Sequence, residues 1–307
     1  MTPSLFDLPL RLGDAALLAP ILFEQLGSRP VPVTSEQRVR IASRAGALRF
    51  SALKPHYGSL ERDPVHPSAC YLCVDAIEGE PLLLRVAPAK TPSSGLFPRS
   101  ILIGRTFIGR EEAVFNVVPF GPGDGEQIEA FSARVNPAFR PKVLGARPVL
   151  RICGDQPTLA FPTALENFAR GRDLQGREEL VFVLGPGQDA AKFRRETLWS
   201  AIRAGWREGY GLQANPSTVE EARACIGFTR FGIESAGAIG WLRRPCDIEL
   251  LTTLEQMEPG LRAFKEADCA VESVALREGS EPREDSAALA REYRAVLNLR
   301  RIHVENQ

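Results

Sequence analysis

The sequence predicts an α/β protein with two parts. A β-rich α+β region, residues 1–142, precedes a TIM-barrel-like parallel βα domain, residues 143–307, which ends in a helical C-terminus. Two observations support this prediction. Between residues 70 and 120 short apolar runs are broken by Gly, Pro and Ser, a pattern typical of hairpins. After residue 145 strand-like and helix-like runs alternate, which predicts a parallel sheet. Only about four such strands are clear, so the predicted barrel is incomplete.

The first region begins with a predicted helix, Asp14 to Leu26, and a proline-rich turn. Its β-type runs are YLCVDAI (71–77), PLLLRVA (81–87), SILIGRTFIG (100–109) and AVFNVVPF (113–120). A glycine turn and a helix follow, with Asp124 as the expected N-cap. Residues 136–148, which are rich in proline, are the predicted connection to the second region.

In the second region the predicted strands cover residues 147–153, 179–185, 211–215 and 228–235, and the helices 161–171, 189–208 and 217–226. The run ELVFVLG, residues 179–185, is nearly all apolar, as expected for a strand covered by helices on both faces. Beyond Trp241 the spacing of apolar residues predicts helices. One stripe comprises Leu250, Leu254 and Met257, and another Leu289, Tyr293, Val296 and Leu297.

The overall composition restricts the class of partner. The 307 residues are 44% hydrophobic, and 38 basic residues balance 38 acidic ones. A net charge of zero removes the electrostatic argument for nucleic acid or an anionic membrane as partner. No apolar run approaches the roughly 20 residues of a membrane span, and the N-terminus lacks the pattern of a secretory signal. We therefore expect a cytoplasmic protein that binds a small molecule; homo-oligomerisation stays open.

Cys70 and Cys73, with His66 upstream, raise the alternative of a zinc site. The surrounding run reads as a strand, in which residues three apart point to opposite faces. No second ligand pair lies at a suitable spacing. Buried strand cysteines are therefore the preferred interpretation.

Polar residues follow the predicted parallel strands, where catalytic groups of such folds gather. Asp155 and Glu234 are the two carboxylates at strand ends and are the candidates for acid or base catalysis. Either could equally be a capping or surface residue. Gln213 and Asn215, at the end of a third strand, are candidate substrate-binding residues.

The turn LGPGQD, residues 184–189, contributes Gln188 and Asp189 as further candidate binding residues. Its backbone N–H groups could hold a phosphate at the start of a helix. The turn matches neither the P-loop nor the dinucleotide fingerprint. A glycine turn with Asp189 as the helix cap is the preferred interpretation. Residues 145–300 contain no histidine, which excludes a multi-histidine metal site built from that part of the chain.

Two stretches, residues 114–148 and 198–235, resemble the tagaturonate epimerase family. The strongest local match is AIRAGWREGYG, residues 201–211, followed by a short strand. The resemblance implies a TIM-type barrel and a metal-dependent enzyme that inverts a carbon of a sugar acid. It also implies a divalent metal held by acidic residues and a histidine on that strand.

The chain departs from the family where the metal would be held. Gln213, Asn215 and Pro216 stand where the resemblance places acid, acid and histidine. Amides are poor ligands for a catalytic divalent ion, and proline offers no side-chain donor. The sequence therefore predicts a hexuronate epimerase-like or isomerase-like protein with a degenerate metal site, which binds or converts a small polar carbohydrate. The alternative is a non-catalytic pseudoenzyme that binds carbohydrate or serves assembly.

Overall fold

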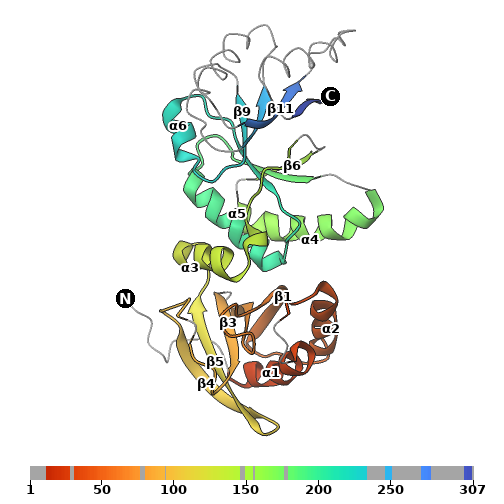
Figure 1. The fold of residues 1–307 in the computed structure, drawn as a ribbon, viewed down its shortest axis with the longest axis vertical. Helices are drawn as coiled ribbons and strands as arrows, with labels where there is room; N and C mark the ends of the chain where they lie inside the picture. Colours follow the sequence, from red (N-terminus) through yellow and green to blue (C-terminus); the bar gives the residue numbers. More distant parts are fainter. Residues whose placement is uncertain are drawn as a thin grey trace. The chain divides into compact units, whose positions relative to one another are not determined.

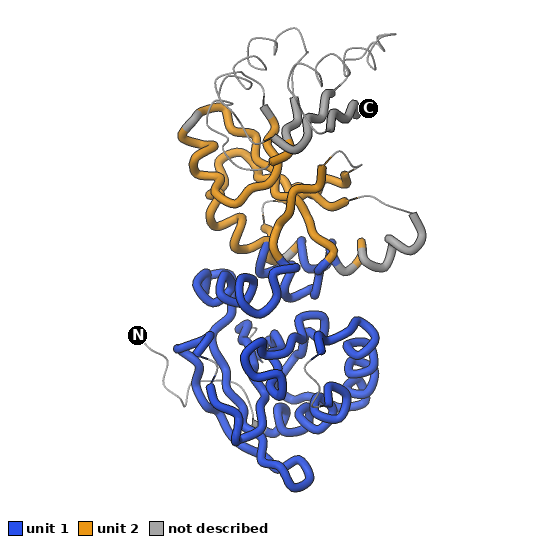
Figure 2. The backbone as a smooth tube through the Cα atoms, in the orientation of Figure 1, with its two compact units in different colours: residues 1–139, 161–166, 198–207 blue, residues 140–160, 167–197, 208–307 orange. Residues whose placement is uncertain are grey.

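The computed structural model describes the chain in segments, which form two compact units (Figure 2). The described residues are 12–27, 31–76, 80–93, 95–145, 149–154, 156–175, 179–233, 246–250, 271–277 and 301–305. Unit 1 comprises residues 1–139, 161–166 and 198–207, and unit 2 comprises residues 140–160, 167–197 and 208–307. The predicted boundary between residues 142 and 143 stays a prediction. No helix within the described segments is long and apolar enough to cross a membrane.

Unit 1 is built on a five-stranded antiparallel sheet with the strand order β1-β2-β3-β5-β4. This confirms antiparallel pairing in the β-rich region. Its elements are α1 (Leu12–Leu26), α2 (Ser35–Ala45), β1 (Leu53–Arg62), β2 (Cys70–Ala76), β3 (Pro81–Pro88), β4 (Ile101–Ile108), β5 (Glu111–Pro119), α3 (Gly125–Ala130), a π-helical turn (Phe131–Val135) and a 3-10 turn (Pro137–Phe139).

The two faces of this sheet are both buried, and they carry different cores. Leu72, Val74 and their neighbours on one face pack against α1 and α2, which Figure 1 shows beside the sheet. Tyr71 and Leu83 on the other face pack with residues of α3 and of the second half of α5 (Ala190–Ala204). Because strand side chains alternate between faces, the apolar residues of β2 are divided between the two cores, and the strand is wholly buried, including Asp75, which pairs with His56 and Arg203.

Buried charges in unit 1 are arranged around Glu61. Its Oε1 atom accepts hydrogen bonds from Arg38 Nη2 at 3.0 Å, from Asn136 Nδ2 at 2.8 Å and from Arg207 Nε at 2.7 Å. Arg207 Nη2 also donates to the carbonyl of Gly58 at 2.6 Å. Burying a carboxylate is costly unless its oxygens are paired, and here three donors compensate one of them.

Unit 2 is a sheet of seven parallel strands in sequential order, β6 to β12. Its elements are β6 (Val149–Cys153), α4 (Pro157–Gln175), β7 (Glu179–Val183), the first half of α5, β8 (Gly211–Ala214), α6 (Val219–Ala224), β9 (Arg230–Ile233), β10 (Cys246–Leu250), β11 (Val271–Arg277) and β12 (Arg301–Glu305). A sequential order is that of a βα barrel and differs from the reversed order of a dinucleotide-binding sheet. Within the described segments β6 and β12 are edge strands, and no closed barrel is seen.

The strand count and the placement of Leu250 in a helix were predicted wrongly. Seven parallel strands are present instead of about four, and Leu250 lies in β10. The helical spacing from Leu250 to Met257 in the sequence left the short strand CDIEL, residues 246–250, unrecognised. Helix α4 also continues through Gly171, where it was predicted to end. The other residues of the predicted C-terminal stripes lie outside the described residues.

The two faces of the parallel sheet have opposite character. Leu180, Phe182, Leu212, Ala214 and Phe231 are buried on one face. The register aligns Val183 with Gln213, Gln213 with Arg230, and Arg230 with Asp247, so these positions share the other face. Gln213, Arg230 and Asp247 are each at most 2% exposed. The sheet therefore has a buried apolar face and an equally buried polar face.

Residues 142–145 cross the amino ends of the central strands before β6 begins. Lys142 N donates to the carbonyl of Tyr210 at 2.9 Å. Leu144 N donates to Asp247 Oδ2 at 2.9 Å, and Gly145 N lies 3.1 Å from the same oxygen. A Cβ at Gly211 would lie 3.2 Å from Leu144 Cδ1, so glycine at the start of β8 leaves room for the crossing chain.

We predict that Gly205→Ala strongly destabilises unit 1. Gly205 has φ +76, and a Cβ there would lie 2.4 Å from the carbonyl oxygen of Gly58. Backbone on both sides prevents relaxation, so we expect a loss of about 3 kcal/mol or more in the free energy of unfolding. Gly109→Ala is the matched control, because Gly109 has φ +63 with open space around it. It should cost only about 1–2 kcal/mol.

Urea unfolding followed by tryptophan fluorescence measures both variants, because Trp199 and Trp206 lie in unit 1. Equal destabilisation by the two substitutions would show that the close approach to Gly58 contributes nothing beyond backbone strain.

Candidate functional site

A cleft of about 870 Å³ lies in unit 2 at the carboxyl ends of β7 and β8. Its volume falls in the range of small-molecule sites. Residues of the β7–α5 loop form one side, and residues following β8 together with α6 form the other. The lining residues are Leu184, Gly185, Pro186, Gly187, Gln188, Asp189, Ala190, Ala191, Ala214, Asn215, Pro216, Ser217, Glu221, Ala224 and Cys225.

Gln188 holds the β7–α5 loop in place. Its Oε1 accepts a hydrogen bond from Gly185 N at 2.8 Å, which closes the turn GPGQ. Its Nε2 donates to the carbonyl of Gly154 at 3.2 Å, and Gly154 directly follows β6. One amide therefore links the carboxyl ends of two neighbouring strands.

Asp189 caps α5, as the preferred interpretation predicted. Its Oδ1 accepts a hydrogen bond from Lys192 N at 2.8 Å, three residues into the helix start. This bond is the main cause that lowers the pKa of Asp189 below its usual value. The carboxylate occupies the helix N–H group that a phosphate would use. The hypothesis of a phosphate cradle is therefore not supported.

The end of β8 carries an amide pair. Gln213 lies inside the strand and is 2% exposed, whereas Asn215 is exposed at the edge of the cleft. Gln213 Nε2 donates to Asn215 Oδ1 at 3.1 Å. Residues i and i+2 of a strand point to the same side, which brings the two amides together. Within the described residues Asn215 Nδ2 has no protein acceptor, so it can donate to a ligand.

The start of α6 forms the opposite wall. Thr218 Oγ1 accepts from Glu221 N at 3.2 Å, which makes Thr218 the N-cap. Glu221 Oε2 accepts from Ser217 N at 2.7 Å and from Ser217 Oγ at 2.9 Å. The backbone bond from Ser217 is the largest cause that lowers the pKa of Glu221. Burial, followed by the nearby Glu221 charge, raises the pKa of Cys225 to about 11.

These groups suit binding better than proton transfer. Asp189 and Glu221 have lowered pKa values, so both stay ionised well below neutral pH. The Cys225 thiol stays protonated at neutral pH and is a weak nucleophile. The cleft therefore offers hydrogen bonds from its polar side chains and apolar contact from the alanines and prolines between them.

The predicted site residues fall into three groups. Gln188, Asp189 and Asn215 line the cleft together, whereas Gln213 lies beneath it and reaches it only through Asn215. Asp155 and Glu234 lie outside the described residues. Their catalytic roles, and the binding roles of the other four, remain predictions. The sequence did not single out Glu221, although Thr218 and Glu221 have the spacing of a capping box.

The described residues of the cleft do not fit a catalytic divalent ion. Such an ion prefers carboxylate, imidazole or thiolate ligands, and β8 presents the amides of Gln213 and Asn215 followed by Pro216. Asp189 and Glu221 are both engaged in helix-start hydrogen bonds. In the part of the chain that the structure describes, no three His, Cys, Asp or Glu residues form a group that could hold a metal ion.

Comparison with known proteins gives one weak likeness. No protein-family model and no curated protein matches the chain. A solved structure of fructuronate-tagaturonate epimerase UxaE from Cohnella laeviribosi, complexed with glycerol, matches with a TM-score of 0.46 and 13% identity. The match covers 88% of this chain and 75% of that one. A likeness of this strength does not assign a fold or an activity.

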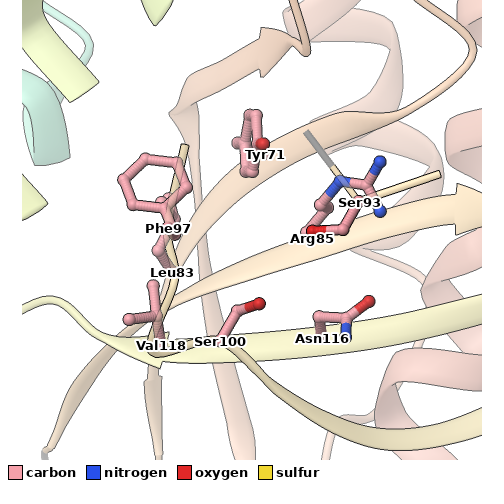
Figure 3. Close-up of a pocket in the computed structure, with 8 residues that line it drawn as sticks. All are labelled: Tyr71, Leu83, Arg85, Ser93, Phe97, Ser100, Asn116 and Val118. Carbon is pink, nitrogen blue, oxygen red and sulfur yellow. The ribbon is translucent and has the colours of Figure 1, made fainter. Parts of the chain in front are cut away.

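A second cavity, in unit 1, is too small for a substrate. Figure 3 shows its lining residues, which come from β2, β3, β5 and the segment before β4 and include Arg85, Ser100 and Asn116. Its volume of about 10 Å³ has room for about one water molecule. Asn116 is half-buried.

The Cys70–Cys73 pair is divided between the two faces of β2, as predicted. Cys70 belongs to the core beneath α1 and α2, and Cys73 to the core on the other side of the sheet. The two thiols therefore do not converge on one point. Burial raises the pKa of each to about 12.

We predict that alkylation separates the cysteines by environment. Cys153 is exposed, whereas Cys70 and Cys73 are buried and protonated at pH 8. Brief treatment of the native protein with iodoacetamide, mapped by mass spectrometry, should modify Cys153 and spare the other two. Modification of Cys70 or Cys73 at the rate of Cys153 would contradict their buried placement; urea-unfolded protein is the positive control.

We also predict that Gln188→Ala loosens the loop beside the cleft. Gly185 N and Gly154 O each lose their partner, so the free energy of unfolding should fall by about 1–2 kcal/mol. Hydrogen exchange at the Gly185 amide should quicken. Gln188→Glu is the control, because it keeps the acceptor for Gly185 but loses the donor to Gly154. An equally fast Gly185 exchange in both variants would contradict the proposed role.

Proposed function

We propose that this protein binds a small polar carbohydrate in the cleft at the carboxyl ends of β7 and β8. We further propose that it is related to the sugar-acid epimerases, as a divergent member with a degenerate metal site. The observation that carries the proposal is Asn215, whose Nδ2 is available as a donor at the edge of a cleft of suitable volume. Asparagine side chains are ordinary partners of ligand hydroxyl groups.

The relationship rests on the sequence resemblance of residues 201–211 and the strand that follows, and on strand order. Seven parallel strands in sequential order are consistent with a TIM-barrel-like domain. Enzymes on such barrels act at the carboxyl ends of the strands. The proposed cleft lies at that end of the sheet, next to β8. A cytoplasmic location is part of the proposal.

Binding without turnover is favoured over epimerase activity. Inverting a carbon beside a carbonyl needs a base and usually a metal that stabilises an oxyanion. Of the two described carboxylates of the cleft, Asp189 caps α5 and Glu221 accepts from Ser217 beside the start of α6, and the polar side chains at the end of β8 are the amides of Gln213 and Asn215. Activity would therefore depend on Asp155 and Glu234. A pseudoenzyme that binds carbohydrate, alone or as a homo-oligomer, accounts for these features because it requires no proton abstraction from the ligand.

We predict that Asn215→Ala weakens carbohydrate binding about tenfold. The variant removes one donor to a ligand hydroxyl, which is worth about 1–1.5 kcal/mol. Isothermal titration with a panel of hexoses and hexuronates at millimolar concentration measures the affinity. Asn116→Ala, the same substitution in unit 1, should leave it unchanged.

Failure of every sugar to bind would refute carbohydrate binding as a function. Epimerase activity is tested separately, by metal analysis of the purified protein and by NMR of hexuronates incubated with it and with added manganese. Conversion that depends on Asp155 or Glu234 would contradict the pseudoenzyme proposal while leaving the site in place.

A further inference from the structure

We infer that the cleft selects neutral polyhydroxy sugars over sugar acids. This inference rests on the proposed function and narrows its ligand class. It reverses the preference that a hexuronate epimerase would require.

The charged side chains among the described lining residues are both acidic. Asp189 stands on the β7 side and Glu221 on the α6 side, and the described lining includes no Lys, Arg or His. Backbone hydrogen bonds lower the pKa of both carboxyls, so both carry a charge at neutral pH. A ligand carboxylate in this cleft would meet two like charges, whereas Lys192 and Arg195, the cations whose charge acts on Asp189, do not line it.

The helix start beside the cleft does not reverse this conclusion. The N-terminus of α5 has a positive partial charge, which would attract an anion. The Asp189 carboxylate already accepts from Lys192 N there and supplies the compensating negative charge. An incoming carboxylate would have to compete with a side chain that is covalently held in place.

Hydroxyl groups match the groups that remain available. A sugar hydroxyl can donate to the carboxylates of Glu221 or Asp189 and accept from Asn215 Nδ2. Ala190, Ala214 and nearby prolines offer apolar surface to the C–H groups of a sugar ring. A carboxylate accepts only, so it could use Asn215 but would be repelled by both acidic residues.

Titration with matched pairs tests the inference. Glucose and glucuronate, galactose and galacturonate, and mannose and mannuronate differ only at C6. For any pair that binds, we expect the neutral sugar to bind about tenfold more tightly than its uronate at low ionic strength and pH 7.5. Two like-charge contacts across a hydrated cleft account for a factor of this size. The difference should shrink at 1 M salt, where the screening length is about 3 Å.

Charge-removing variants identify the source of the selectivity. The double variant Asp189→Asn, Glu221→Gln keeps an N-cap side chain and an acceptor for Ser217, but removes both charges. It should bring the uronate to within about threefold of the neutral sugar. The double variant Glu36→Gln, Glu111→Gln removes two exposed charges from unit 1 and is the matched control. It should keep the tenfold preference.

The outcomes separate this inference from the function on which it rests. A neutral preference that is lost in the cleft variant and kept in the control supports both. A uronate that binds the wild-type protein as tightly as its neutral partner overturns the inference and leaves carbohydrate binding intact. If no sugar binds, the proposed function fails and the inference fails with it. A neutral preference unchanged in the cleft variant overturns the charge argument.

Discussion

The hydrogen bonds from Leu144 and Gly145 to Asp247 fix the arrangement of unit 2. Asp247 is 1% exposed, and the two backbone N–H groups offset part of the cost of burying its charge. In a flat sheet four strand spacings of about 4.8 Å would separate β6 from β10 by about 19 Å. The chain instead crosses at the amino ends of the strands, with Leu144 beside Gly211, before it enters β6. One end of the sheet is thus closed by the chain itself, and the opposite end carries the loops that form the cleft.

Helix starts shape that cleft, and their requirements limit its chemistry. Asp189 begins α5, and Glu221 braces the start of α6 through Ser217. A capping carboxylate accepts its N–H groups more strongly when it is ionised, so the hydrogen bond that stabilises the helix also lowers the pKa. For Asp189 this stabilisation persists above the unfolded pKa of about 3.9 and is lost only as the pH falls through the folded value. A residue held in this way makes a steady hydrogen-bond acceptor and a poor general base at neutral pH.

The sequence predicted the parts of the fold that depend on local pattern. Apolar strands such as β7, the helix of residues 190–204 and the cap at Asp189 were each readable from spacing and residue type. Strands β10 to β12 were missed because the sequence beyond Trp241 also contains runs of apolar residues with helical spacing. Helix α2 was also missed, although Thr34 and Gln37 form the capping box that marks its start.

Depth within the fold was harder to predict than element type. Gln213 was expected to line the site, but it is not the last residue of its strand, which continues to Ala214. The hydrogen bond from Leu184 N to Gln213 O keeps Gln213 within the sheet. Pairings between distant segments, such as Gln188 with Gly154 or Leu144 with Asp247, leave no periodic trace in the sequence.

The amide pair on β8 explains how this strand end is ordered without a metal ion. Carboxylates at positions 213 and 215 would lie on the same side of the strand and repel each other unless a cation stood between them. Gln213 and Asn215 attract each other instead, because one donates to the other at 3.1 Å. This strand end is therefore stable by itself without a cation, and it still directs a hydrogen-bond donor into the cleft. An amide pair at such a position offers no anionic ligand to a metal ion and keeps a donor that can reach a hydroxyl group.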